Sequence, residues 1–167
     1  VGRLFDVVPA SDEAVRFRLT APLSSASLAP EETDRLRAFA GAAGEETRRF
    51  AIDILGRRLD PRRPQGEADL SVLLSSLASD SSPQVRETAA LALGRAATTS
   101  EAERALLQAL DSDADWEVRA TAARALRGAV GSQEAREALT QAASGDSHPA
   151  VRAAAAEALG APEPATR

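Results

Sequence analysis

The sequence predicts an all-α protein built from a repeated pair of helices, and three observations lead to this prediction. The chain has 167 residues, of which only 3% are aromatic, and alanine supplies much of its apolar content. Small side chains bury a core well only where helices approach closely, and a large sheet would need more β-branched and aromatic residues. Similar segments also recur at a constant interval, and their apolar residues follow a helical period.

The repeat is clearest in three segments that start 33 residues apart, at Asp80, Asp113 and Asp146. From two residues after each aspartate, the segments read SPQVRETAALALG, DWEVRATAARALR and HPAVRAAAAEALG. A weaker copy, GEETRRFAIDILG, lies 38 residues before the first of them, which indicates an insertion of about five residues in LDPRRPQGEAD. A fainter echo around Val15 and Arg16 is interpreted as a degenerate cap or half repeat.

Each marked segment is predicted to be the second helix of a pair. Pro83 and Pro149 suit the first helical position, and Ser82 and Asp115 are predicted N-caps. Valine, alanine and leucine then recur at every fourth position, which makes one apolar stripe. Glycines after the final leucine are expected to stop three of these helices: Gly56, Gly94 and Gly160.

A first helix is predicted before each of these segments. EADLSVLLSSLAS has leucines at helical spacing, and SEAERALLQALD is expected to open with a capping box from Ser100 to Glu103. The predicted pairs cover residues 31–59, 68–97, 100–129 and 132–160. Residues 1–30 are expected to form the degenerate cap, and residues 161–167 a flexible tail.

The pattern D-x-x-P-x-V-R-x-x-A-A-x-A-L-G resembles HEAT-like repeats, in particular the short type found in phycobilisome lyases. The resemblance implies an α-solenoid of stacked antiparallel helix pairs, in which stacking supplies the core that no single repeat can bury. It also implies a structural ladder between neighbouring repeats, formed by Asp80, Arg86, Asp113, Arg119, Asp146 and Arg152. The first repeat has Ala42 where the aspartate would stand, which puts the ladder in question there.

Several kinds of chemistry are excluded or unsupported by the sequence. The chain has no cysteine and one histidine, His148, so thiolate chemistry and internal multi-histidine metal sites are excluded. It has no phosphate-binding glycine-rich loop, no apolar run that approaches a membrane span, and no secretory signal at its start. We therefore expect a cytoplasmic, non-catalytic protein without metal or cofactor.

A protein-binding role is the favoured function. The resemblance places the second helix of each pair on the concave surface, and the net charge of −5 with few aromatic residues argues against nucleic acid. Clustered arginines near the first repeats favour a partner with an acidic segment, bound by a monomer. The predicted binding surface consists of Arg49, Asp53, Arg57, Arg58, Glu87, Leu91, Arg95 and Arg124.

Two other functions remain as alternatives. One is an enzyme or enzyme subunit like the phycobilisome lyases, which use this repeat type for chromophore attachment. The other is a DNA-binding protein like the HEAT-like alkylpurine glycosylases, although the chain offers little for a basic, aromatic groove. Trp116, the only tryptophan, is expected to cover the turn between two helices, with a partner-anchoring role as the alternative.

Overall fold

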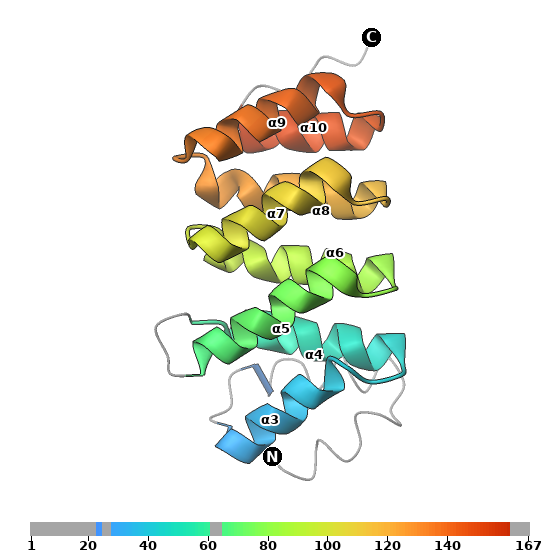
Figure 1. Cartoon of the computed structure of the whole chain (residues 1–167), viewed down its shortest axis with the longest axis vertical. Coiled ribbons are helices and arrows are strands. Elements are labelled where there is room, and N and C mark those ends of the chain that lie inside the picture. The colour runs from blue at the N-terminus through green and yellow to red at the C-terminus, as the bar shows by residue number, and fades with distance from the viewer. Residues whose placement is uncertain (1–22, 25–27, 61–64, 161–167) are drawn as a thin grey trace.

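The computed structural model describes residues 23–24, 28–60 and 65–160, and these residues form a stack of antiparallel helix pairs (Figure 1). The predicted N-terminal cap lies almost wholly outside the described residues, and the predicted tail lies outside them entirely. Leu23, which belongs to the predicted cap and is described, is completely buried. The predicted all-α solenoid is confirmed.

Four helix pairs follow one another along the described chain. The first helices, called A helices here, are α3 (Pro30–Phe39), α5 (Gly66–Ser79), α7 (Ser100–Ser112) and α9 (Gln133–Gly145). The second helices, called B helices, are α4 (Glu45–Arg58), α6 (Pro83–Leu93), α8 (Trp116–Ala125) and α10 (Pro149–Ala158). Short 3-10 helices continue two of the B helices: η2 (Gly94–Ala96) follows α6 and η3 (Leu126–Ala129) follows α8.

The helices form two layers. In Figure 1 the A helices lie in front and the B helices behind them. Each B helix packs against its own A helix and against the B helices of neighbouring repeats, and these B–B contacts are more extensive than the A–A contacts. The turns inside each pair lie along one edge of the stack, and the turns that join successive pairs lie along the opposite edge.

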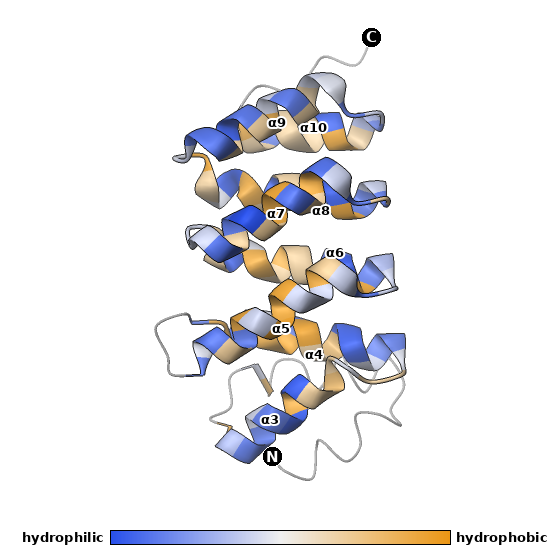
Figure 2. Cartoon of the chain, in the orientation of Figure 1, coloured by the Kyte–Doolittle hydropathy of each residue, from blue (hydrophilic) through white to orange (hydrophobic). Residues whose placement is uncertain are grey.

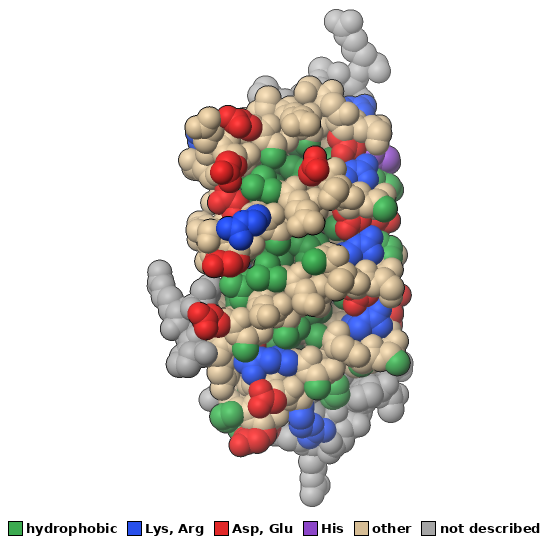
Figure 3. All heavy atoms as spheres, viewed as in Figure 1, with side chains coloured by type: hydrophobic (Ala, Val, Ile, Leu, Met, Phe, Trp, Pro, Cys, Tyr) green, Lys and Arg blue, Asp and Glu red, His purple; other side chains and the backbone are tan. Residues whose placement is uncertain are grey.

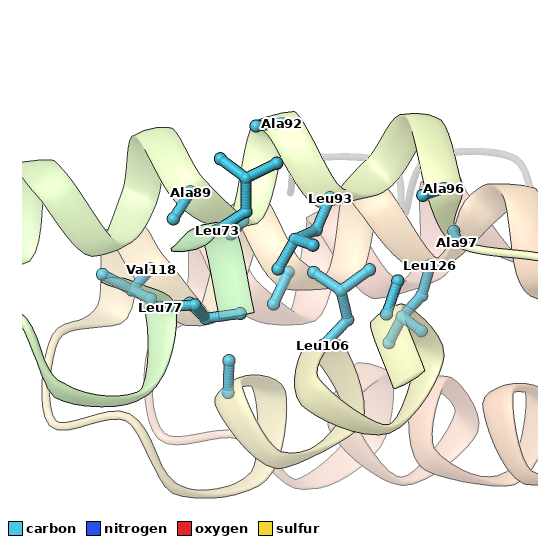
Figure 4. Close-up of a cluster of buried hydrophobic side chains, with 14 of the residues drawn as sticks. Leu73, Leu77, Ala89, Ala92, Leu93, Ala96, Ala97, Leu106, Val118 and Leu126 are labelled. Carbon is cyan, nitrogen blue, oxygen red and sulfur yellow. The ribbon is translucent and has the colours of Figure 1, made fainter. Parts of the chain in front are cut away.

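The core is one continuous seam between the layers and between neighbouring repeats. Val85, Val118 and Val151 occupy equivalent positions in three B helices and are completely buried. The leucines at equivalent positions of the A helices are also completely buried: Leu73, Leu106 and Leu139. Figure 4 shows the middle of this cluster, and Figure 2 shows apolar residues on the surfaces where helices meet. Stacking therefore supplies the core, as expected of a solenoid.

The helix starts are set by side-chain caps. Ser82 and Asp115 accept hydrogen bonds from the backbone N–H groups of Val85 and Glu117, which confirms both predicted N-caps. His148 caps α10 in the same way. The predicted capping box from Ser100 to Glu103 is wrong.

The residue that caps α7 is Thr99, whose hydroxyl accepts from the N–H of Ala102. Thr99 and Ser100 are both residue types that cap helices, and only the first has non-helical backbone angles here. Thr99 is also equivalent to Ser132, which caps α9. The repeat register therefore identifies the cap more reliably than the local motif.

The Leu-Gly motif does not end every B helix. Gly160 has a φ of +76°, the left-handed conformation that glycine permits, and it follows α10 as predicted. Gly56 lies inside α4, which continues to Arg58, so the predicted stop there is wrong. A Cβ atom on Gly56 would lie 2.4 Å from the Cβ of Ala92 on α6. Glycine is needed at this position because two B helices approach closely.

Candidate functional site

One edge of the stack carries ion pairs that join each repeat to the next. The guanidinium group of one B helix donates to the aspartate that precedes the next B helix. The Nε–oxygen distances are 2.7 Å for Arg48–Asp80, 2.8 Å for Arg86–Asp113 and 2.9 Å for Arg119–Asp146. In each pair Nη2 donates to the second carboxylate oxygen, so the contact is bidentate. We call these three pairs the ladder.

A second contact fixes each ladder arginine within its own repeat. Nη1 of Arg86 and of Arg119 donates to the backbone carbonyl of the aspartate six residues earlier, at 2.9 Å in both cases. Nη1 of Arg48 donates to the carbonyl of Ala42 at 3.1 Å in the same way. The doubt about the first repeat is thereby resolved, since each arginine pairs with the next repeat's aspartate and needs only a carbonyl from its own.

The ladder geometry lowers the pKa values of its aspartates. Burial disfavours the charged forms of Asp80 and Asp113, but hydrogen bonds from the paired arginine and from a backbone N–H two residues later, together with the charges of the nearby arginines, outweigh it. The pKa of each aspartate therefore lies below the usual 3.8. The hydrogen bond from Arg119 is the main cause of the lowered pKa of Asp146. Blue and red side chains alternate along this edge in Figure 3.

Trp116 lies at the same edge, at the start of α8. Its ring stacks on that of His148, with the centroids 4.0 Å apart and the planes 18° from parallel. The tryptophan therefore covers the helix start of the neighbouring repeat, and it remains 39% exposed. This stack links α8 to the cap of α10, beside the Arg119–Asp146 pair.

The predicted binding surface falls on the B layer, and the structure separates its members by their contacts. Four charged members are engaged within the protein. Arg57 donates to both carboxylate oxygens of Asp53 at 2.9 Å, and Arg49 donates to Glu46 at 3.0 Å. Glu87 accepts a hydrogen bond from the Thr121 hydroxyl at 3.2 Å.

Arg58, another predicted member of the binding surface, makes a different kind of contact. Its Nη1 donates to the backbone carbonyl of Leu23 at 2.9 Å, and the side chain is half-buried. Equivalent positions in later repeats hold Ala96 and Ala129, which are both buried. Arg58 therefore connects α4 to the segment before α3.

The remaining three members form an exposed group. Leu91 is 62% exposed, the highest value among the large apolar side chains that the structure describes. Arg95 follows one turn later, and Arg124 occupies on α8 the position that Leu91 occupies on α6. Both arginines are exposed, and neither forms an ion pair or side-chain hydrogen bond with another described residue. We call Leu91, Arg95 and Arg124 the exposed triad.

Grooves on the opposite face were not predicted from the sequence. Successive A helices leave hollows of about 300 Å³ between α5 and α7 and 220 Å³ between α7 and α9, and a third of about 370 Å³ lies between α5 and the turn that follows α3. The first two contain Gln108 and Gln141 at equivalent positions, and the two hollows beside α5 reach the ladder residue Asp80. The signal in the sequence was this repeated glutamine, 33 residues apart, within alanine-rich helices.

Metal sites and membrane-spanning helices are both absent from the described part of the chain. Among the residues described, no group of three or more His, Cys, Asp or Glu side chains could hold a metal ion. Within the same residues, no helix has the length and apolar character required to cross a membrane.

The repeated helix pairs and their ladder define a class of protein. Models of HEAT repeats match residues 70–99 and residues 103–165, which together make up more than half of the chain. The chain is a HEAT-repeat protein.

The architecture is also shared with a solved structure. The chain is similar to one chain in the structure of the complex of CpcE and CpcF of phycocyanin lyase from Nostoc sp. PCC7120. The TM-score is 0.74 and the identity 24%, over 94% of this chain and 96% of that chain. No curated protein matches the chain by sequence. The likeness therefore concerns the fold, and the function must be argued from the surfaces of this chain.

Proposed function

We propose that this protein is a non-catalytic interaction module that binds a partner protein on its B-helix face, with the exposed triad at the centre of contact. The observation that carries the proposal is Leu91, a large apolar side chain left 62% exposed beside two arginines that have no ion-pair partner in the described part of the chain. Arginine is enriched among the residues that dominate protein interfaces, and an exposed apolar side chain beside it offers surface for a partner to cover. The extensive B–B packing also supports an inner surface on this side of the solenoid.

The chemistry of the exposed triad favours one kind of partner segment. An apolar side chain would cover Leu91, while carboxylates on either side would meet the guanidinium groups of Arg95 and Arg124. Asp53 adds little repulsion because Arg57 neutralises it, whereas Glu87 keeps its charge and accepts only a hydrogen bond from the Thr121 hydroxyl. The carboxylates of the partner segment are therefore expected to lie beside Arg95 and Arg124 and away from Glu87. The partner segment is therefore expected to be acidic with one central apolar anchor.

Site-specific photo-crosslinking tests the proposal. A crosslinking amino acid at Thr88, on the B-helix face, is compared in the native cell with one at Ser71, on the exposed surface of α5. We expect a crosslinked protein from position 88 that disappears with Leu91→Ser or Arg124→Glu and that is not obtained from position 71. Crosslinks that are equal at both positions, or that ignore both substitutions, would contradict the proposal.

A second candidate is a subunit of a complex like phycocyanin lyase, and the fold likeness over nearly the whole of both chains favours it. In this case the partner on the B-helix face would be another subunit of the complex. A bilin tetrapyrrole added to the purified protein, with and without the crosslinked partner, should then change its absorption spectrum. An unchanged spectrum in both samples would leave the interaction module as the function.

A further inference from the structure

Arg152 occupies in the last repeat the position of the ladder arginines, but it makes only part of their contacts. Nη1 of Arg152 donates to the carbonyl of Asp146 at 2.8 Å and to that of Ser147 at 3.2 Å, so its guanidinium is anchored as in the earlier repeats. In Arg48, Arg86 and Arg119, Nε and Nη2 hold the carboxylate of the next repeat. Nε and Nη2 of Arg152 have no such partner among the described residues. In three repeats of this chain, the equivalent guanidinium group therefore binds an aspartate carboxylate.

The helix surface beside Arg152 is also incompletely covered. Ala90 and Ala123 are completely buried, whereas the equivalent Ala156 on α10 is half-buried. The same difference holds for the final leucine, which is completely buried in the earlier repeats and half-buried at Leu159. The residues that a following repeat would cover on α10 are therefore still apolar and partly open.

The neighbouring surface of α9 limits what can dock here. Thr140 is exposed at the position where Leu74 and Leu107 are half-buried against the core. A complete additional helix pair would place its A helix against this polar position, which stacking does not favour. The open surface is therefore confined mainly to α10 and the guanidinium of Arg152.

The first described repeat of this chain does not supply the missing carboxylate. In a second copy stacked with this repeat against α10, Ala42 would lie at the position that holds an aspartate in the later repeats. The occupant inferred here therefore carries an acidic residue at that position.

We propose that α10 is a second docking surface, which binds one helix of a partner protein with an aspartate or glutamate at the end that faces Arg152. The carboxylate accepts from Nε and Nη2, as Asp113 accepts from Arg86, and small apolar side chains of the helix cover Ala156 and Leu159. This surface is separate from the exposed triad, and the inference does not rest on the proposed function.

The experiment uses a copy of residues 111–129 as the probe, because this segment carries Asp113 and docks on α6 within the protein. The copy is fused after residue 167 of the full chain through a Gly/Ser linker of roughly 20 residues, which gives a high effective concentration. The readout is the change in the NMR signals of Arg152 Hε and of the amides of Ala156 and Leu159. Arg136→Gln is the matched control, since Arg136 also donates to two carbonyls, those of Val130 and Gly131.

We expect these signals to shift in the fusion, and the bound fraction to fall about tenfold when the copy carries Asn in place of Asp or when the chain carries Arg152→Gln. Arg152→Asp combined with arginine at the aspartate position of the copy should restore binding, which separates a lost charge pair from local unfolding. Unshifted signals in the fusion, or equal shifts with Asp and Asn, would overturn the inference. Equal loss with Arg136→Gln and Arg152→Gln would overturn it as well.

Discussion

The ladder edge and the B-helix face are built on the same repeat, but they use it in opposite ways. At the ladder edge, the same two residue types return at the same positions, and each pair joins adjacent repeats through a bidentate contact. On the B-helix face, one equivalent position holds Asp53, Leu91, Arg124 and Glu157 in turn. A position that is constant across repeats serves the stack, and a position that varies is free to serve recognition.

The largest expected effect on stability comes from breaking one of the three Arg–Asp ion pairs of the ladder, each of which we call a rung. Arg119→Ala should lower the free energy of unfolding by about 2–4 kcal/mol, because Asp146 would stay buried without its charged partner. Arg152→Ala removes an arginine with the same backbone contacts but no rung, and it should cost less. Urea unfolding followed by circular dichroism measures both, and equal losses would show that the rung adds nothing.

Acid should weaken the ladder edge. The aspartates have lowered pKa values in the folded state, so their contribution is present above the unfolded-state pKa and is lost as pH falls through the folded value. We expect stability to be constant from neutral pH to about 5 and to fall below about 4. Asp113→Asn should be less stable at neutral pH and should lose less on acidification. Parallel pH curves for both proteins would contradict this expectation.

The close approach of B helices gives a smaller effect. Gly56→Ala places a Cβ 2.4 Å from that of Ala92, so α4 and α6 must move apart, at a cost of about 1–3 kcal/mol. Gly131→Ala is the matched control, because a Cβ there has no atom within 4 Å. Thermal unfolding of the two variants compares them. Equal thermal stability of the two variants would mean that α4 and α6 can move apart without cost.

The smallest effect on stability is expected on the B-helix face. Leu91→Ser should change the free energy of unfolding by no more than about 0.5 kcal/mol, because the side chain is 62% exposed. The same substitution should abolish the crosslink from position 88. A large loss of stability would place Leu91 with the core instead of with the exposed triad.

The sequence predicted the features that the 33-residue register repeats, and it was weaker where one residue type serves two purposes. The helix pairs and the caps at Ser82 and Asp115 were predicted, because equivalent residues recur and each has a local physical role. Gly56 was misread as a helix stop, because glycine also permits close helix packing and the sequence does not distinguish the two uses. The ion pair of Arg37 with Asp69, 2.8 Å long between α3 and α5, was not anticipated, since no repeat register relates the two residues.

The candidate site was less predictable than the fold. The sequence indicated residues of the B-helix face, but only the structure shows that Arg57 is engaged by Asp53 while Arg124 has no polar side-chain contact with another described residue. Arg58 was grouped with its neighbours in sequence, whereas its guanidinium reaches the Leu23 carbonyl. Side-chain pairing depends on distances between repeats, which a repeat pattern does not contain.

Two double-mutant cycles, measured as free energies of unfolding, test the contrast between the ladder edge and the B-helix face most directly. One cycle combines Arg86→Ala with Asp113→Ala across a rung, and the other combines Leu91→Ala with Arg124→Ala at equivalent positions of the exposed face. We predict a coupling of about 1–3 kcal/mol across the rung and a value near zero on the face. Equal couplings in the two cycles would contradict the division between constant positions that hold the stack and variable positions that are left for a partner.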